Sequence, residues 1–293
     1  MQIVVTSASG ANGEGLGAVL RFGLDGSRDA PFPEDAGIVD PRGIHVHPDG
    51  EHLYVNSGDD RVLLLDNVGS VTAATPTIRD LNPGGGVVAP DGRYCVGSRT
   101  MRTLVAFPPD LRAPAELLLP RSVAAFPRGF AFAPDGRLFL AAGASAAGDG
   151  TGRVLVGASN RALEVLIEDP EFSPLDLTLA PNGNLLVSSE FPFGSPSALG
   201  TVREYDPYSG ELVRVFAPDA SVSFRQPRGL RFAPEGSLCC VARDEVVAFD
   251  FETGRCLGAL VRLDGMYGQA LEFFPRTRMR APGPPPSVSG SRA

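Results

Sequence analysis

Three Pro-Arg-Gly triplets contain the side chains best suited to chemistry in this chain of 293 residues, namely Arg42, Arg128 and Arg228. A guanidinium group stays charged at physiological pH and presents forked N–H donors that match a carboxylate or a phosphate. The sequence contains no lysine, which excludes mechanisms that need an amine side chain, such as a Schiff base or a P-loop lysine. The side chains of the triplets are therefore suited to recognition of an anion.

Carboxylates and histidines are the other groups that could take part in a reaction. Asp176 and Glu190 are candidates for acid/base work or, if a metal is bound, for metal ligation. All three histidines, His45, His47 and His52, lie within one short segment. We expect His47, beside a Pro-Asp-Gly turn, to be structural and His52 to lie at the surface. His45 is a further candidate base, more distant than Asp176 and Glu190.

A repeated phrase places these residues in a common framework. The pattern Pro-x-Gly, a short apolar stretch and Pro-Asp-Gly recurs with variations along the chain, and the sixth copy lacks the Asp-Gly turn. The copies are 41–50, 83–92, 127–136, 174–183, 227–236 and 268–275. They follow one another at intervals of about 40 to 50 residues, the period of a propeller blade. The repeat therefore predicts six blades.

Each copy has the composition of a β-hairpin. In Pro-Asp-Gly, proline fixes φ, aspartate bonds the local backbone and glycine accepts a positive φ. A nearly continuous apolar strand follows, as in 138–140 and 238–241, and such a strand must be covered on both faces. Gly (35 residues) and Pro (27) are abundant while 43% of residues are hydrophobic, which favours many short strands around a real core. Radially packed sheets satisfy all of these conditions.

The two ends of the chain are expected to share one blade. The sixth copy supplies only an innermost strand, and 2–6 and 18–22 read as the second and third strands that it lacks. We therefore predict an all-β, six-bladed propeller of four-stranded antiparallel blades over residues 1–275, closed by the N- and C-terminal strands in one blade. The Pro-, Gly- and Ser-rich tail, 276–293, is expected to be flexible.

The repeat resembles the superfamily of six-bladed propellers that includes NHL-repeat proteins, gluconolactonase-like lactonases and virginiamycin B lyase. The resemblance covers about residues 1–275 and is specific for architecture, because this fold carries hydrolases, lyases and binding modules alike. It places the residue before the first glycine of each innermost strand at the mouth of the central channel. That series reads Arg42, Gly84, Arg128, Leu175, Arg228 and Gln269.

Three arginines that converge on one axis need negative charge nearby. One interpretation is a bound anion at the mouth, with the arginines and Gln269 as substrate-binding residues. The other is internal neutralisation by the protein, with Asp176 and Glu190 as the partners. Both interpretations remain open from the sequence.

The resemblance also bears on a metal ion. Gluconolactonase-like propellers hold a divalent metal with Glu, Asn and Asp side chains at the mouth positions, and none of those residue types stands at the six matched positions here. Asp176 is displaced by one position. Glu190 occupies a place comparable to a glutamate of virginiamycin B lyase, which works with a histidine and magnesium, but no histidine accompanies it. The cofactor is therefore unassigned, and a lactonase of the usual metal-dependent pattern is disfavoured.

Register across the repeats brings further charges beside His45. Glu272 occupies the position equivalent to His45 in the adjacent sixth copy, and Arg231 occupies it in the fifth. The three side chains are expected to form a charged line across three blades. His45 oriented by Glu272 would be a general base. A buried polar network that joins the blades is the alternative, and the one that we favour.

Three long segments between strands are expected to wall a pocket beside the mouth: 7–17, 142–152 and 189–200. Phe191 and Phe193 in the last of these are predicted to form an apolar side of the pocket.

Composition excludes several classes of partner. The formal net charge of -8 argues against nucleic-acid binding, which needs a basic face. The sequence shows neither a secretory signal nor an apolar run long enough to span a bilayer, so no membrane partner and a cytoplasmic location are expected. The four cysteines, Cys95, Cys239, Cys240 and Cys256, are too irregularly spaced for a disulfide framework and read mainly as small buried hydrophobes.

Two functions of different kinds remain. The first is a small-molecule enzyme of the hydrolase or lyase type, which acts on an anionic substrate at the mouth. The second is a non-catalytic module that binds a ligand or a protein partner through its loops.

Overall fold

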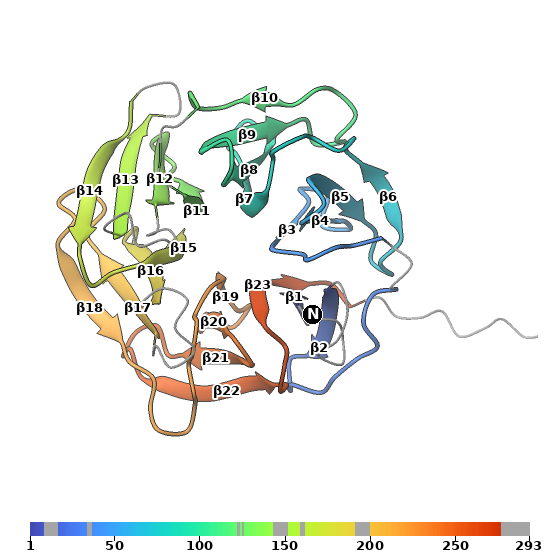
Figure 1. Ribbon diagram of the computed structural model, residues 1–293. Helices are drawn as coiled ribbons and strands as arrows, with labels where there is room; N and C mark the ends of the chain where they lie inside the picture. The colour runs from blue at the N-terminus through green and yellow to red at the C-terminus, as the bar shows by residue number, and fades with distance from the viewer. Residues whose placement is uncertain are drawn as a thin grey trace, which may run out of the picture.

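The fold is a closed ring of β-sheets (Figure 1). The computed structural model describes residues 1–8, 17–33, 37–121, 124, 126–142, 152–158, 162–190 and 200–276. In these residues, strands β1 to β23 form six antiparallel sheets, which are the six predicted blades. No helix of the described part of the chain is long and apolar enough to cross a membrane. The all-β, six-bladed prediction is confirmed.

Each blade is numbered here by the order of its innermost strand. The innermost strands are β3 (Gly43–Val46), β7 (Pro83–Val88), β11 (Pro127–Phe132), β15 (Pro174–Leu179), β19 (Leu230–Phe232) and β23 (Gly268–Phe274). The second strands are β4 (Leu53–Ser57), β8 (Tyr94–Ser98), β12 (Arg137–Ala142), β16 (Leu185–Glu190), β20 (Leu238–Ala242) and β1 (Gln2–Ser7). The third strands are β5 (Arg61–Leu65), β9 (Thr103–Phe107), β13 (Gly152–Ala158), β17 (Gly200–Tyr205), β21 (Glu245–Phe249) and β2 (Ala18–Gly23). The outermost strands are β6 (Val71–Ala74), β10 (Glu116–Leu117), β14 (Glu164–Asp169), β18 (Leu212–Phe216) and β22 (Cys256–Arg262).

The turn between the first two strands of a blade works as its sequence predicts. The glycines that end the Pro-Asp-Gly turns have positive φ, for example 87° at Gly92 and at Gly136. Each donates its N–H to a carbonyl three residues earlier, at 2.9 Å in both cases. The residue types of the repeat therefore determine the hairpin directly.

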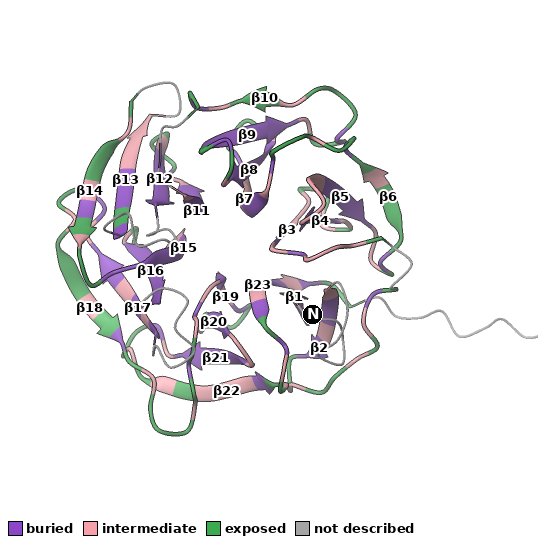
Figure 2. Ribbon diagram, in the orientation of Figure 1, coloured by how far each residue is buried: buried purple, intermediate pink, exposed green. Residues whose placement is uncertain are grey.

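The hydrophobic core is divided into six clusters, one between each pair of neighbouring blades. Strand β20 shows why the second strands are apolar on both faces. Cys239 and Val241 pack toward blade 6, whereas Leu238, Cys240 and Ala242 pack toward blade 4. Figure 2 shows the result, buried strands toward the inside of each blade and exposed ones along the rim. Cys95 and both cysteines of β20 are buried, as expected, and burial raises the pKa of Cys95 and of Cys239 to about 12.

The two ends of the chain close the ring within blade 6. Strand β1 pairs with β2 on one side and with β23 on the other, which confirms the predicted closure. The place of a fourth strand is taken by residues 28–32, which run beside β2. There Asp29 donates its N–H to the Arg21 carbonyl at 2.9 Å, and Phe32 donates to the Val19 carbonyl at 3.0 Å.

Glycines let the innermost strands approach one another around the axis. A Cβ atom on Gly129 would lie 2.6 Å from the Cα atom of Asp176 in the next blade, and one on Gly229 would lie 2.7 Å from the Cα atom of Ala270. Such distances exclude a side chain at either position. The glycine after each repeated arginine is therefore required by the crowding of strands around the axis.

Candidate functional site

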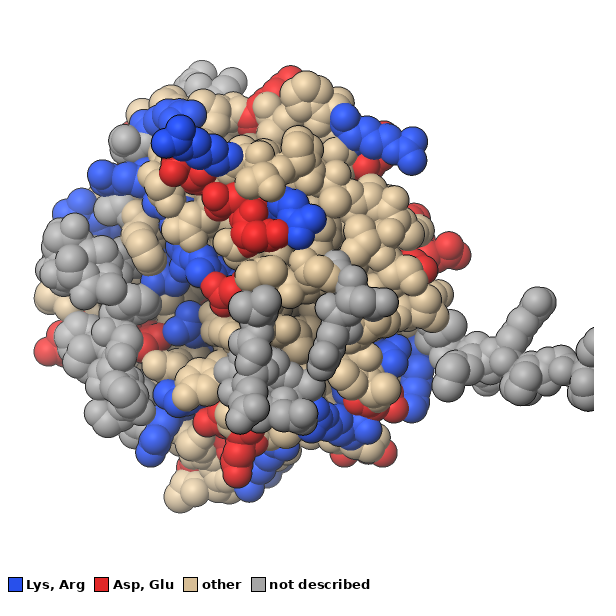
Figure 3. Space-filling view, turned by 45° about the vertical axis from the view of Figure 1, so that its right-hand side comes forward, with Lys and Arg blue, Asp and Glu red and all other residues tan. Residues whose placement is uncertain are grey.

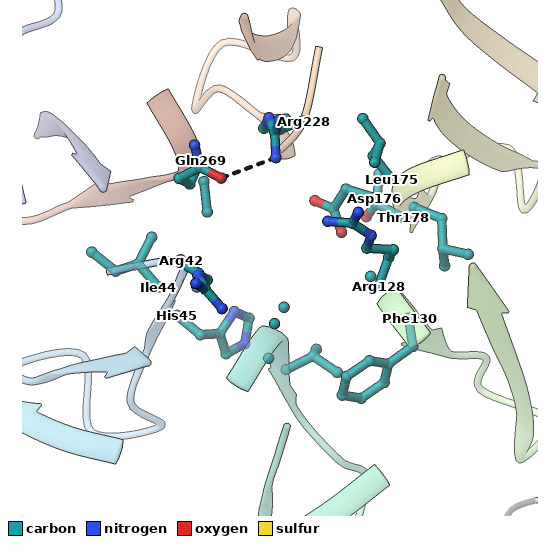
Figure 4. A pocket seen from close by; sticks show the side chains of 18 of the residues that line it. Arg42, Ile44, His45, Arg128, Phe130, Leu175, Asp176, Thr178, Arg228 and Gln269 are labelled. Atoms are coloured by element: carbon teal, nitrogen blue, oxygen red, sulfur yellow. Dashed lines mark hydrogen bonds between the residues drawn. The ribbon is translucent and has the colours of Figure 1, made fainter. Parts of the chain in front are cut away.

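A cavity of about 190 Å³ lies at the centre of the ring, lined by residues from all six blades. Figure 4 shows Arg42, Arg128 and Arg228 directed into it from three different blades. Its side-chain lining consists of Arg42, Ile44, His45, Val87, Arg99, Arg128, Phe130, Ala131, Leu175, Asp176, Leu177, Thr178, Arg228, Arg231, Gln269 and Ala270. The prediction that the arginines of blades 1, 3 and 5 face the axis therefore agrees with the geometry.

Arg42 has a protein carboxylate as its partner. Its Nε donates to Asp40 Oδ2 at 2.9 Å, and its Nη1 donates to Asn82 Oδ1 at 2.5 Å. Asp40 stands two residues earlier and is partly exposed. Neither of the partners expected for the arginines, Asp176 or Glu190, contacts Arg42, so part of its charge is compensated from within blade 1.

Arg228 is held by two side chains of neighbouring blades. Its Nη1 donates to Gln269 Oε1 at 3.1 Å, and its Nη2 lies 3.8 Å from Glu190 Oε2. Burial lowers the pKa of Arg228, Glu190 opposes that shift and Arg42 adds to it. The expected pairing of an arginine with Glu190 is present, at the long limit of an ion pair.

Arg128 is the most buried arginine of the site, with 8% of its surface exposed. Its guanidinium carbon lies 4.3 Å from the centroid of the Phe126 ring, a cation–π contact. Phe126 adopts a φ of 52°, a conformation that costs free energy for a non-glycine residue. Burial, together with the charges of Arg228 and Arg42, lowers the pKa of Arg128 to about 9, while Glu190 opposes the shift. The group thus remains cationic at neutral pH in surroundings that disfavour its charge.

A fourth arginine, Arg99, joins the site from the turn after β8 in blade 2. It lines the cavity, its Nη2 donates to Asn82 Oδ1 at 2.6 Å, and its guanidinium lies 5.7 Å from the Phe126 ring centroid. Sequence reasoning missed it because only the residue before each innermost strand was matched. The turns between the second and third strands lie on the same face of the ring as the starts of the innermost strands. A search of those turns for arginines would have found Arg99. We call Arg42, Arg99, Arg128 and Arg228 the arginine cluster.

Asp176 forms its ion pair with Arg231, an arginine outside the arginine cluster. Its Oδ2 accepts the N–H of Leu230 at 2.9 Å and lies 3.5 Å from Nη1 of Arg231. Burial raises the pKa of Asp176, while Arg231 opposes the shift. Asp176 lines the cavity, but its charge is used between blades 4 and 5 and not by the arginine cluster.

The predicted line of His45, Glu272 and Arg231 is present across blades 1, 6 and 5. His45 Nδ1 lies 2.9 Å from Glu272 Oε1, and Arg231 Nε donates to that same oxygen at 2.5 Å. Burial alone would raise the pKa of Glu272, but Arg231 and His45 hold it below its usual range. A carboxylate at Nδ1 favours the neutral tautomer that carries its proton on Nδ1, which leaves the Nε2 lone pair as the base. His45 also lines the cavity.

The remaining predicted site residues lie elsewhere. Glu190 is completely buried at the end of β16 and contacts Arg228 without lining the cavity. Gln269 lines the cavity and accepts from Arg228. Phe191 and Phe193 lie outside the described residues, as do most of the three long segments expected to wall the pocket.

The cavity does not fit the divalent metal site that the resemblance implies. Within the described ranges, the one group of three His, Asp or Glu ligand atoms close enough to share an ion is at another place in the fold. Asp176 Oδ2 already accepts a backbone N–H and faces Arg231. Cationic side chains dominate the cavity instead, so we derive no step through a metal there.

The surface outside the channel carries charges of both signs. Figure 3 shows acidic and basic side chains interspersed over the visible face. One exposed pair is Arg153 with Glu168, which joins β13 to β14.

These features define the chain as a six-bladed β-propeller with a cationic central cavity. No protein-family model and no curated protein sequence matches it. Among solved structures, it is similar to a chain of a nidogen/laminin complex, with a TM-score of 0.71 at 11% identity over 92% of this chain and 97% of the other. It is also similar to a gluconolactonase from Xanthomonas campestris, with a TM-score of 0.60 at 18% identity over 89% and 86%.

A third similar structure is a streptogramin B lyase, with a TM-score of 0.53 at 14% identity over 72% of this chain and 66% of the other. At these identities the similarity establishes the fold alone. The six-bladed propeller fold predicted from the repeat is confirmed, and no family is assigned.

Proposed function

We propose that the central cavity binds a small organic anion through the arginine cluster. The observation that carries this proposal is the convergence of four guanidinium groups from four blades on one cavity of about 190 Å³. Among the described residues, the carboxylates within ion-pair distance of the cluster are Asp40 and Glu190. A carboxylate or phosphate matches such a cluster, because guanidinium groups bind these anions through forked, charge-assisted hydrogen bonds.

The lowered pKa of Arg128 supports the same conclusion. Burial is the main cause of that shift, and it disfavours the charged form of Arg128. An anion bound beside Arg128 favours the charged form and so opposes the effect of burial.

We further propose that the bound anion is a substrate for proton transfer by His45, in a reaction of the hydrolase or lyase type. In this mechanism, Glu272 holds the Nδ1–H and Nε2 removes a proton, either from water or from a carbon next to the anionic group. The charge that develops on the substrate oxygen is stabilised by the arginine cluster. Two proteins of similar structure are named as a gluconolactonase and a lyase, so the fold is compatible with this class of reaction. Their similarity to this chain extends to the fold alone.

Binding without turnover is the second candidate function, and one observation favours it. The contacts of His45, Glu272 and Arg231 join three blades, so this network closes the ring whether or not a reaction occurs. Under that function the protein is an anion-binding module.

A thermal-shift screen of small organic acids and phosphates tests the proposal, with EDTA in one arm and added divalent metals in the other. Anion binding predicts a saturable rise in Tm in the EDTA arm that Arg128→Gln removes. Arg153→Gln, on the outer face of blade 3, is the matched control and retains the rise. A screen without any saturable shift contradicts the proposal.

Turnover separates the enzyme from the module. Lactones, esters and hydroxy acids related to the best anion are incubated with the wild-type protein and with His45→Asn. An enzyme that uses His45 loses kcat in the variant while the anion still raises Tm. Absence of turnover with retained anion binding identifies the module.

A further inference from the structure

A cluster of two histidines and one aspartate lies at the far end of β3 from Arg42, away from the arginine cluster. The Oδ2 atom of Asp49 is 2.9 Å from His47 Nδ1 and 2.7 Å from His52 Nδ1. All three ligand atoms lie within 4.8 Å of one another. The side chains are between 17% and 39% exposed, so solvent reaches the cluster.

The hairpin between β3 and β4 holds this arrangement in place. His47 donates its N–H to the His52 carbonyl at 2.9 Å, which pairs the two histidines across the turn. Asp49 Oδ1 accepts the N–H groups of Glu51 and His52 at 2.8 and 3.1 Å, which leaves Oδ2 directed at the imidazoles. The His47 ring also packs on Tyr54, with 5.2 Å between ring centroids. The donor set is therefore fixed by short-range contacts.

The same turn in other blades serves a different purpose. In blade 2, Asp91 Oδ1 accepts the Arg93 N–H at 3.0 Å and Oδ2 accepts Arg93 Nε at 2.8 Å. In blade 3, Asp135 makes the same two bonds with Arg137. Blade 1 has Glu51 at the place of these arginines, and two imidazole nitrogens occupy the space in front of the carboxylate.

We propose that His47, Asp49 and His52 form a binding site for a divalent first-row transition-metal ion, with Zn²⁺ as the type case. Two imidazole nitrogens and one carboxylate oxygen are ligands that such ions accept, and solvent completes the coordination. Metal binding requires the Nε2–H tautomer of both histidines, so that each Nδ1 lone pair faces the ion. Nδ1 of His47 already acts as an acceptor, from the Asp49 N–H at 3.2 Å. The site is separate from the central cavity and does not depend on the proposed function.

The test is a titration of metal-stripped protein with ZnCl₂ by calorimetry, and with CoCl₂ by visible absorption, which reports nitrogen ligation. His52→Asn and His47→Asn place an amide nitrogen near the former Nδ1 and keep a hydrogen bond to Asp49, but they remove a metal ligand. We expect saturable binding near one ion per chain, weakened at least about 10-fold in each of these variants. Asp49→Asn is expected to do the same.

Asp135→Asn is the matched control, because it changes the same position of the same turn in blade 3, where no imidazole is present. Arg128→Gln is a second control that separates this site from the central cavity. Both are expected to bind Zn²⁺ as the wild-type protein does. If either histidine variant and Asp49→Asn bind with wild-type affinity, or if the wild-type protein shows no saturable binding, the site is refuted. His52→Asn, at a partly exposed position, keeps the test valid should His47→Asn fail to fold.

Discussion

His45 Nδ1 lies 2.9 Å from Glu272 Oε1, and this contact joins the first blade of the propeller to the last. Glu272 also accepts a hydrogen bond from Arg231 of blade 5. One buried carboxylate thus links three blades at the place where the ring closes. The same carboxylate orients the candidate base of the central cavity. Under the proposed reaction, both the closure of the ring and the orientation of the base therefore depend on Glu272.

Glu272→Gln is expected to destabilise the protein by about 3 kcal/mol at pH 7, because it removes the closer of the two carboxylates beside the buried Arg231, the other being Asp176. The pKa of Glu272 is lowered in the folded state from an ordinary value of 4.5. Its contribution is therefore complete above that value and is lost as pH falls through the lower folded-state pKa. Urea unfolding at pH 7 and pH 3 measures this difference. Equal destabilisation at both pH values would contradict the assignment.

Arg128→Met is expected to stabilise the ligand-free protein by about 1 kcal/mol while it removes anion binding. The methionine keeps an apolar contact with Phe126, and the buried charge beside Arg228 is gone. The sign follows from the pKa of Arg128, which folding lowers to about 9, because folding then disfavours the charged form. Thermal unfolding without added anions checks this. A loss of stability would mean that the charge of Arg128 is fully compensated within the protein.

Asp40→Asn is expected to strengthen anion binding several-fold. Asp40 is the protein's own anionic partner of Arg42, so its neutral analogue leaves more positive charge for the ligand. The anion affinity of the variant is compared with that of Asp59→Asn, which removes an equivalent partner from Arg61 outside the cavity lining. Similar affinities in the wild-type protein and both variants would show that Arg42 does not contact the ligand.

Gly129→Ala is expected to cost about 2 kcal/mol, because the added Cβ would lie 2.1 Å from Asp176 Oδ1 and 2.6 Å from its Cα. Gly84→Ala is the matched control, since the Cβ there meets nothing closer than 3.4 Å. Equilibrium unfolding of both variants measures the contrast. Equal stabilities would contradict close packing of the innermost strands at Gly129.

The propeller could be predicted from the sequence because its signals are local and repeated. Each Pro-Asp-Gly turn determines a hairpin on its own, and six copies at blade spacing leave little choice of architecture. The line of His45, Glu272 and Arg231 was predictable for the same reason, since equivalent positions of neighbouring innermost strands lie side by side in a ring.

The partners of the arginines could not be predicted in the same way. Asp40 precedes Arg42 and lies outside the repeated phrase. Arg99 belongs to a turn of blade 2, and whether its side chain reaches the cavity depends on how that blade is placed in three dimensions. The sequence suggested Asp176 and Glu190 as partners of the arginines, and of these two Glu190 contacts the cluster. Asp176 stands one position after the residue that matches Arg42 in the repeat, and its carboxylate faces Arg231 instead. His52, expected at the surface, is part of a cluster that depends on pairing across a hairpin.

Isothermal titration of the best anion from the screen tests the central claim most directly. The wild-type protein is compared with Arg128→Gln, Arg228→Gln and the outer-face control Arg153→Gln. We predict one site per chain, a loss of about 2 kcal/mol or roughly 30-fold in affinity for each cavity variant, and wild-type affinity for the control. Equal affinities in all four proteins would contradict an anion site at the centre of the ring.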